Sequence, residues 1–475
     1  MAIDSPFEKL RSNFAYSLLG RITDTCGSLI VFWLLSRYFQ LETYGEYGWI
    51  STIIFTLNPL LNFETSKIIT REIAKDRNLL QRYIKAGLHI QILLSVSFVF
   101  LTFFSGLIFL KGMNKLHMPF LFAVLNEIIF QFGFVYIAAY YGIENLKMDF
   151  ISSVIHRLVG ILGIFIGIFL DQGLTFFYIA LTIGSAFKLV SLRIGFRKQL
   201  AKDFTENINP LMKDILRVCY LLAIANFVAA SLVRVDAYII KYIKGLESLA
   251  LFHAPHQLIL QAQIIPSILI APIFPIIVKV FKEDLEKGKE IYHNFSRLSF
   301  TIANIASFFF FGFSDIILLL LGGEKFAKAT STLRLLAISL LPLFLILLNT
   351  IALITIGKQK QILAASISSF VINLSLGLLL VPLLDTRGAA IATIIAYSFQ
   401  ATLLMIFVYR HLFKVNVMKI ISFIPVIWIP FIYLYLNASS IKYSSIFFYV
   451  YPFFASLLLL LSKSHRESLK LLVRK

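Results

Sequence analysis

VINLSLGLLLVPLLDTRGAAIATIIAY, residues 371–397, is the stretch that decides the fold. It predicts an apolar helix with one polar residue, Asn373, near its start and with its end at Pro382. The turn at 383–387 is so short that the second apolar helix must lie antiparallel beside the first. Gly388 and the alanines after it put small residues on the second helix, so its backbone can approach neighbours closely.

Two short patterns recur at nearly the same spacing. LDQGL at 170–174 lies between apolar runs as LDTRG does at 384–388, which is 214 residues later. LETYGEY at 41–47 is echoed by LESLALF at 246–252, which is 205 residues later. Two echoes in the same order and at nearly one offset predict a duplicated unit of roughly 200 residues.

Composition assigns the chain to the membrane. Of its 475 residues, 59% are hydrophobic and 15% are charged, and the mean hydropathy is +0.84. A soluble protein is nearer 45–50% apolar and 25% charged. The net charge of +19 does not indicate nucleic acid, because the cations lie in short loops between apolar spans. Cys26 and Cys219 both fall inside spans and indicate no disulfide.

A window of about 20 apolar residues predicts fourteen transmembrane helices, all-α and polytopic. Six precede the basic loop at 197–213, so the second copy enters the membrane in the same direction as the first. The two six-helix lobes are then related by a pseudo-twofold along the membrane normal, with two further helices after them. The spans lie near 13–38, 44–66, 84–110, 116–140, 150–170, 173–195, 214–240, 247–278, 293–321, 328–356, 362–382, 388–410, 416–437 and 443–462.

The domain organisation and the orientation follow from these spans. With the N-terminus inside, 29 of the 44 Lys and Arg residues fall in cytoplasmic segments, 9 fall on the opposite side and 6 lie within spans. This asymmetry predicts that both termini are cytoplasmic. The expected parts are an N-lobe at 1–200, a cytoplasmic loop at 201–213, a C-lobe at 214–413, and two helices with a basic tail at 414–475.

Ionisable residues at membrane depth are costly, so they usually face a partner or a cavity. Arg21 and Asp24 lie one turn apart on the first span, where they either pair with each other or line a hydrated cavity in which Arg21 holds an anion. Arg234 and Asp236 are two residues apart and point to different faces, so Arg234 needs another partner.

Other embedded charges leave alternatives open. Lys188 and Arg334 lie about two turns from helix ends, where they either snorkel to the headgroups or face a cavity. Arg157 and Arg297 are shallower, and we expect both to snorkel. Glu127, near the centre of its span, is a cation site, a proton carrier or a buried partner for an Arg on another helix.

The sequence holds no arrangement for covalent chemistry. It contains no phosphate-binding G-x-x-x-x-G-K-[ST] loop and no metal-ligand spacing, so we expect neither an enzyme nor a metal site. Prolines instead interrupt helices that correspond in the repeat, at Pro59 and at Pro255, Pro266, Pro272 and Pro275. Paired breaks of this kind suit a rocking transporter.

Four passages together are typical of one family. They are Asn13-Phe14-Ala15-Tyr16 with Tyr44-Gly45-Glu46-Tyr47; Ile69-Thr70-Arg71-Glu72-Ile73-Ala74; Arg234-Val235-Asp236 with Phe274-Pro275; and Asn349, Gly357-Lys358-Gln359-Lys360, Asn373, Val381-Pro382 and Gly388-Ala389-Ala390-Ile391-Ala392-Thr393. In these the chain resembles polysaccharide flippases of the O-antigen (Wzx) type, in the multidrug/oligosaccharidyl-lipid/polysaccharide export superfamily. It departs from them at Asn62-Phe63-Glu64, where a glycine is expected beside the aromatic residue.

The resemblance implies a flippase that moves an undecaprenyl-diphosphate-linked oligosaccharide across the bacterial inner membrane by alternating access. Membrane lipids, a polysaccharide polymerase and chain-length machinery are the implied partners, and H⁺ or Na⁺ is the implied coupling ion, with no bound cofactor. The alternatives are a drug/cation antiporter of the same superfamily and a flippase for a peptidoglycan-precursor lipid. The candidate substrate-binding cations are Arg21, Arg234, Lys188 and Arg334, and the candidate ion-coupling acids are Asp24, Glu127 and Asp236.

Overall fold

The computed structural model describes residues 6–197, 207–262 and 285–412. Over these residues the chain is built from helices and turns, with no strand. It forms two compact units, Met1–Arg234 and Val235–Lys475, and the division falls within α9 (Asn209–Lys244). The lobe boundary predicted at 201–213 lies partly outside the described residues and stays a prediction.

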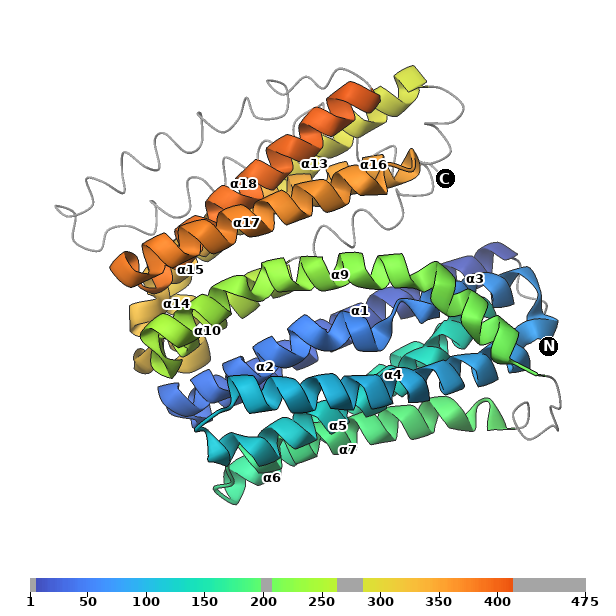
Figure 1. The fold of residues 1–475 in the computed structure, drawn as a ribbon, viewed down its shortest axis with the longest axis horizontal. Coiled ribbons are helices and arrows are strands. Elements are labelled where there is room, and N and C mark those ends of the chain that lie inside the picture. Colours follow the sequence, from blue (N-terminus) through green and yellow to red (C-terminus); the bar gives the residue numbers. More distant parts are fainter. Residues whose placement is uncertain (1–5, 198–206, 263–284, 413–475) are drawn as a thin grey trace. The chain divides into compact units, whose positions relative to one another are not determined.

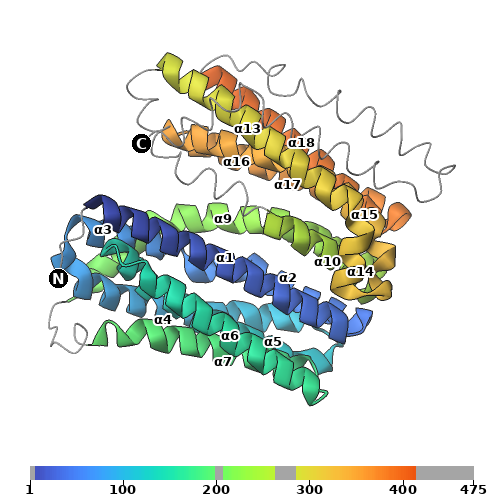
Figure 2. The ribbon, with the colours of Figure 1, turned by 180° about the vertical axis from the view of Figure 1, so that it is seen from behind.

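Unit 1 is a bundle of long helices (Figures 1 and 2). In it α6 packs along α1 and α7, while α5 packs along α7, α4 and α2. The short α3 closes one end by burying Ile69 and Ile73 against α4 and α5. Besides the first part of α9, its α-helices are α1 (Pro6–Tyr38), α2 (Leu41–Asn62), α3 (Thr65–Lys75), α4 (Leu80–Phe109), α5 (His117–Gly142), α6 (Lys147–Phe169) and α7 (Leu174–Ile194).

Unit 2 has its own core. In it α18 packs along α17, α16 and α15, and α13 packs along α16 and α15. Tyr292, Leu348 and Leu404 are buried at the centre of one apolar cluster there. Besides the second part of α9, its α-helices are α10 (Leu246–Ala262), α13 (Leu285–Gly312), α14 (Ser314–Gly322), α15 (Thr330–Ile338), α16 (Leu340–Thr355), α17 (Gln359–Leu384) and α18 (Thr386–His411).

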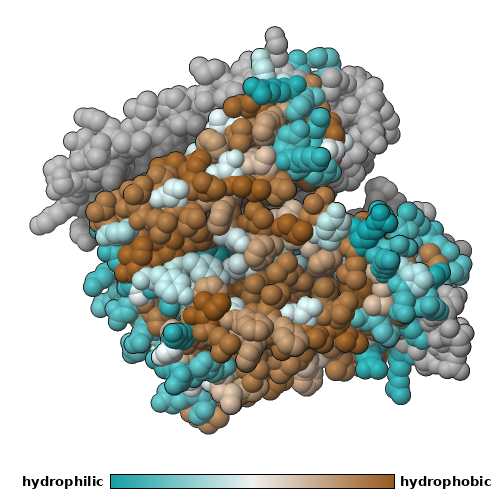
Figure 3. All heavy atoms as spheres, in the orientation of Figure 1, coloured by the Kyte–Doolittle hydropathy of each residue, from teal (hydrophilic) through white to brown (hydrophobic). Residues whose placement is uncertain are grey.

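The prediction of an all-helical protein with many membrane-spanning helices is confirmed for the described part of the chain, although the span predicted at 44–66 is not found. Ten helices there are long and apolar enough to cross a membrane; α2 and the 17 described residues of α10 are not among them. The outer face of α4 is apolar, as Figure 3 shows, with exposed Phe100, Phe103 and Phe104, which suits contact with lipid. The spans predicted at 416–437 and 443–462 lie outside the described residues.

The stretch at 371–397 folds as a helical hairpin of α17 and α18. The predicted helix end at Pro382 is wrong, because the helix runs on to Leu384 and only Asp385 separates it from α18. A proline inside a helix removes one backbone donor, and membrane helices tolerate this where neighbouring groups compensate. The carbonyl of Pro382 accepts a hydrogen bond from Lys244 Nζ at 2.8 Å.

The two halves of the predicted repeat have matching turns. Asp171 in the α6–α7 turn has a φ of 51°, and Asp385 in the α17–α18 turn has a φ of 55°. Within unit 1, Tyr38 Oη donates to Asp171 Oδ1 at 2.7 Å from the end of α1. Within unit 2, Ser248 Oγ donates to Asp385 Oδ2 at 3.2 Å from the start of α10. In unit 1 the donor, Tyr38, lies three residues before the echoed segment 41–47, and in unit 2 the donor, Ser248, lies within the echoed segment 246–252. The two turns therefore have similar neighbours, as a duplicated unit predicts.

The expected glycine between α2 and α3 is replaced by two residues in the left-handed region. Phe63 and Glu64 have φ values of 52° and 56°, a conformation that costs a non-glycine residue about 1 kcal/mol or more. Local contacts offset this cost. Glu64 accepts a hydrogen bond from Asn226 Nδ2 on α9 and forms an ion pair with Lys67 at 2.9 Å.

Candidate functional site

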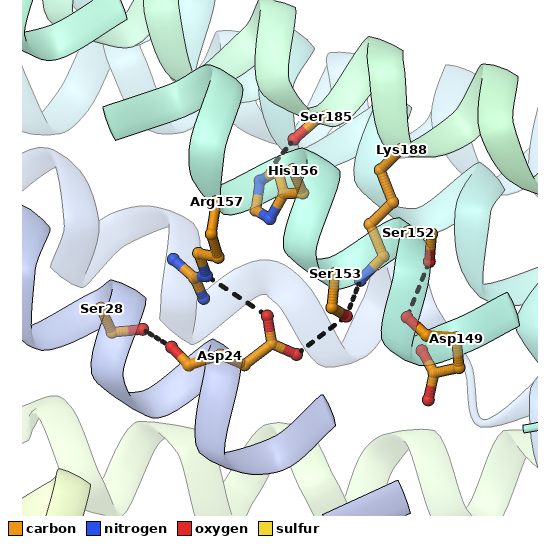
Figure 4. A network of polar contacts seen from close by, with 9 residues as sticks. All are labelled: Asp24, Ser28, Asp149, Ser152, Ser153, His156, Arg157, Ser185 and Lys188. Carbon is orange, nitrogen blue, oxygen red and sulfur yellow. Dashed lines mark hydrogen bonds and ion pairs between the residues drawn. The ribbon is translucent and has the colours of Figure 1, made fainter. Parts of the chain in front are cut away.

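Asp24 on α1 is bound from α6, as Figure 4 shows. Its Oδ1 accepts a hydrogen bond from Arg157 Nε at 3.2 Å, and its Oδ2 accepts one from Ser153 Oγ at 3.3 Å. Within the described part of the chain, Asp24 therefore pairs with Arg157 and not with Arg21. The snorkelling predicted for Arg157 is wrong, because a carboxylate on the neighbouring helix offers its charge a partner at the same depth.

Lys188 on α7 lies across Ser153 from Asp24 (Figure 4). Its Nζ donates to Ser153 Oγ at 3.1 Å and lies 4.9 Å from the centre of the Phe130 ring. The side chain is buried, so it does not extend to the headgroups. Ser153 thus accepts from a buried cation and donates to Asp24, which makes one continuous polar chain across three helices.

The two arginines expected to bind an anion have different surroundings within unit 1. Arg21 is exposed on α1. Arg234 on α9 is buried, and its Cζ lies 4.4 Å from the centre of the Phe55 ring on α2. Cation–π contact with an aromatic face stabilises a guanidinium, whose N–H donors lie along its edge, where an anion binds.

Glu127 on α5 is held by amide side chains. Its Oε1 accepts hydrogen bonds from Asn58 Nδ2 on α2 and from Gln131 Nε2, the latter at 3.0 Å. No Arg forms an ion pair with Glu127 in the described part of the chain, so of the three open interpretations the buried Arg partner is not what the structure has. A carboxyl with amide donors on one oxygen can still carry a proton or contact a cation with the other.

Asp236 joins three helices in the core of unit 2. Its Oδ2 accepts hydrogen bonds from Asn373 Nδ2 on α17 at 3.0 Å and from Thr393 Oγ1 on α18 at 2.8 Å. The residue is only 1% exposed. Over the described residues, neither its Oδ1 nor the Oδ1 of Asn373 receives a hydrogen bond. Buried oxygens without a donor are rare, and they attract a proton or a cation.

Arg334 lies apart from these groups. Its Nη2 is 2.6 Å from Asp315 Oδ2, and its Nε donates to Ser314 Oγ at 3.0 Å. Both partners are on α14, the short helix that precedes α15 in unit 2. An anion that binds Arg334 would have to displace this ion pair.

Several residues of these clusters were missed at the level of sequence. Ser153 and Arg157 are four residues apart on one face of α6, and only that spacing could have linked them to Asp24. The partners of Asp236 had a clearer signal. Asn373 and Thr393 are polar residues inside the two apolar helices of the stretch 371–397, where a polar side chain needs a partner.

Solved structures share this fold at low sequence identity. A multidrug resistance MATE transporter in an inward-facing conformation has a TM-score of 0.70 and 17% identity, covering 81% of this chain and 93% of its own. The lipid II flippase MurJ in an inward closed conformation has a TM-score of 0.69 and 13% identity, covering 96% and 99%. A MOP superfamily transporter from Pyrococcus furiosus has a TM-score of 0.58 and 15% identity, covering 84% and 94%.

These similarities confirm the predicted fold class, an all-helical membrane protein with the two-lobe fold of those transporters. Comparison with the sequences of curated proteins finds no match. A family model described as polysaccharide biosynthesis protein matches residues 10–281, which is more than half of the chain. The chain therefore belongs to the polysaccharide biosynthesis protein family.

Proposed function

We propose that this protein is a flippase that moves an undecaprenyl-diphosphate-linked oligosaccharide, the repeat unit of O-antigen or of a similar surface polysaccharide, across the bacterial inner membrane. The observation that carries the proposal is the cluster of cations at membrane depth in unit 1, in a chain of the polysaccharide biosynthesis family. Membrane depth is where a diphosphate attached to a lipid tail must pass. Both termini are expected in the cytoplasm, and the rocking of two lobes would give alternating access.

The proposed binding roles follow from chemistry. Guanidinium groups give phosphate bidentate, charge-assisted hydrogen bonds, so Arg21 and Arg234 are assigned to the diphosphate. Lys188 adds a point charge from below the surface. Arg334 is a weaker candidate on this geometry, since Asp315 already occupies its guanidinium. The polyprenyl tail stays in lipid, which the apolar outer face of α4 suits.

Energy coupling is proposed to use a buried carboxyl group. Asp236 suits an ion because its Oδ1 and the Oδ1 of Asn373, its hydrogen-bond partner, receive no hydrogen bond in the described structure. Glu127 is the second candidate. Asp24 suits this role less, because Arg157 and Ser153 engage both of its oxygens.

A second candidate function is the export of a cationic drug in exchange for an ion. The observation that favours it is the presence of a buried carboxyl group in each unit, Glu127 in unit 1 and Asp236 in unit 2, either of which could hold an organic cation. A flippase for a peptidoglycan-precursor lipid is the third candidate, since the MurJ structure has the same fold. The substrate that accumulates when the protein is absent separates the three functions.

Deletion of the gene is expected to leave an undecaprenyl-linked glycan in the inner leaflet, and the wild-type gene should restore export. Arg234→Ala should restore about a tenth or less, because a charge-assisted hydrogen bond contributes about 1.5–3 kcal/mol. Arg234→Lys should restore part of it. Glycan reaching the outer leaflet is measured by lectin labelling of spheroplasts, with membrane levels of each variant checked.

The matched control is Lys111→Ala, which removes a cation from the exposed segment between α4 and α5. It should restore export fully. Full export by both Arg234→Ala and Arg21→Ala would rule out their roles in diphosphate binding. Sensitivity of the deletion strain to cationic drugs, without glycan accumulation, would replace the flippase with the antiporter.

Glu127→Gln tests the second coupling candidate. Glutamine keeps an acceptor for Asn58 and Gln131 but cannot ionise, so we expect a stability change of only about 1 kcal/mol. If Glu127 carries the coupling proton, substrate movement in vesicles should lose its response to an imposed pH gradient while binding is retained. An unchanged response would remove Glu127 from the mechanism.

A further inference from the structure

The polar chain of unit 1, drawn in Figure 4, has a partly exposed end and a buried end by the exposed fractions of its residues. At the partly exposed end the side chain of Asp24 is 39% exposed and that of Arg157 is 20% exposed. At the buried end Ser153 is 1% exposed and Lys188 is 3% exposed. The carboxylate therefore occupies the accessible position, and the buried cation lies behind it. An anion that arrives from the surface meets the position that Asp24 holds.

Arg157 has most of its donors available at this position. Only its Nε is bonded to Asp24, and over the described residues its two terminal Nη groups make no hydrogen bond. A guanidinium carries five N–H donors in a rigid fork that matches a phosphate edge. The contact with Asp24 therefore uses only one of the five N–H donors of Arg157. A phosphate could accept two hydrogen bonds from the same guanidinium.

A glycine on α1 makes room for Arg157. A Cβ atom placed at Gly27 would lie 2.5 Å from Arg157 Cδ and 2.7 Å from its Cγ, which is too close for real atoms. The aliphatic part of Arg157 therefore lies against the backbone of α1, and Gly27 fixes where the guanidinium sits. Two helical turns earlier, at Gly20, an added Cβ would meet only Phe150 Cα at 3.8 Å.

The charges around the chain leave a surplus for an anion. Over the described residues, the electrostatic interactions of this cluster join three cations, Arg21, Arg157 and Lys188, with two acids, Asp24 and Asp149. Asp149 has a separate partner, since Tyr141 Oη donates to its Oδ2 at 2.9 Å. Moving Asp24 away from Arg157 would therefore expose a strongly cationic surface with one acid already engaged.

We infer that Asp24 is an internal stand-in for phosphate: it holds Arg157 and, through Ser153, Lys188 in place, and the diphosphate of the substrate displaces it. Arg157 is then a substrate ligand, and Gly27 is a positioning residue. The inference rests on the proposed function, since it assumes a diphosphate substrate. Displacement of Asp24 also removes one polar link between α1 and α6, so that binding would be coupled to movement of the first helix.

The rival interpretation is that the ion pair of Asp24 with Arg157 is purely structural. The two interpretations predict different results for Asp24→Asn. If Asp24 competes with phosphate, Asp24→Asn should raise the affinity for a diphosphate, since asparagine keeps the shape and loses the charge. If Asp24 only fastens α1 to α6, the same variant should lower thermal stability and leave affinity unchanged.

The probe is farnesyl diphosphate, with farnesol as the uncharged comparison, binding to the purified full-length protein in detergent. We expect Asp24→Asn to bind farnesyl diphosphate about tenfold more tightly, or ~1.4 kcal/mol. Arg157→Ala and Gly27→Ala should bind it about tenfold more weakly, and Gly20→Ala should bind as the wild type does. Arg157→Lys, which keeps the charge and loses the fork, should weaken binding without loss of stability.

Asp149→Asn is the control for charge alone. It removes one negative charge from the same cluster without changing a contact of Arg157. Its affinity for farnesyl diphosphate should therefore rise clearly less than that of Asp24→Asn. An equal rise in affinity for Asp149→Asn and Asp24→Asn would overturn the stand-in role and leave the flippase proposal intact. Unchanged affinity of Asp24→Asn and Arg157→Lys would do the same. A wild-type protein that binds farnesyl diphosphate no better than farnesol would overturn both.

Discussion

Gly388→Ala is expected to destabilise unit 2, although it adds only one methyl group. An added Cβ would clash with the carbonyl oxygen of Leu380 and would lie 2.5 Å from its carbonyl carbon and 2.9 Å from Val381 N. These are backbone atoms of α17, which cannot rotate away as a side chain can. Alanine gains about 1 kcal/mol in helix propensity, but overpacking costs about 1–3 kcal/mol and sometimes more.

The measurement is the amount of monodisperse protein in detergent and its thermal unfolding midpoint. Gly160→Ala is the matched control, because it is also a helical glycine, on α6, and its added Cβ would meet only Leu181 Cδ2 at 3.7 Å. We expect Gly160→Ala to behave as the wild type or better. Normal yield and midpoint for Gly388→Ala would mean that α17 and α18 lie farther apart than the structure has them.

The hairpin of α17 and α18 shows why the fold could be predicted from sequence. Membrane helices must satisfy their own backbone hydrogen bonds, so apolar length alone reveals them. A short turn then fixes which helices are neighbours, and small residues such as Gly388 mark where they meet. The end of α17 could not be predicted from Pro382, because a proline inside a membrane helix does not always end it. The backbone at Phe63 was beyond prediction, because sequence patterns do not show which contacts stabilise a left-handed residue.

Sequence alone could identify the charged residues of the candidate site, but it could not predict which of them contact one another. Charges are scarce inside membrane spans, so Asp24, Lys188 and Asp236 could be identified one by one. Their partners lie far away in sequence: Asp24 and Arg157 are 133 residues apart, and Asp236 and Asn373 are 137 apart. Which face each helix turns to its neighbour depends on packing across the bundle. Spacing along a single helix therefore suggested that Arg21 pairs with Asp24, whereas in the structure Arg157 pairs with Asp24.

Asp236→Asn is expected to abolish ion-driven translocation while the protein still folds. Asparagine has nearly the same shape and no charge, so the cost of a buried carboxylate disappears and the stability should be unchanged or slightly higher. Without the charge, the two oxygens that lack donors can no longer hold a cation or exchange a proton. Proteoliposomes with an imposed Na⁺ or pH gradient and a fluorescent lipid-linked oligosaccharide should show about a tenfold or larger loss of gradient-driven movement, or ~1.4 kcal/mol or more.

Asp171→Asn makes the same chemical change in the exposed α6–α7 turn, where asparagine tolerates a positive φ, and it should transport as the wild type does. Thr393→Val keeps the carboxylate and removes one hydroxyl that contacts it, so it should raise the ion concentration needed for half-maximal transport without abolishing transport.

Stabilisation of the purified protein by Na⁺ should be present in the wild type and lost in Asp236→Asn if Na⁺ is the ion; its absence in both would point to a proton. Gradient-driven transport that survives in Asp236→Asn would exclude Asp236 as the coupling residue, because a group that cannot change its charge cannot respond to the ion.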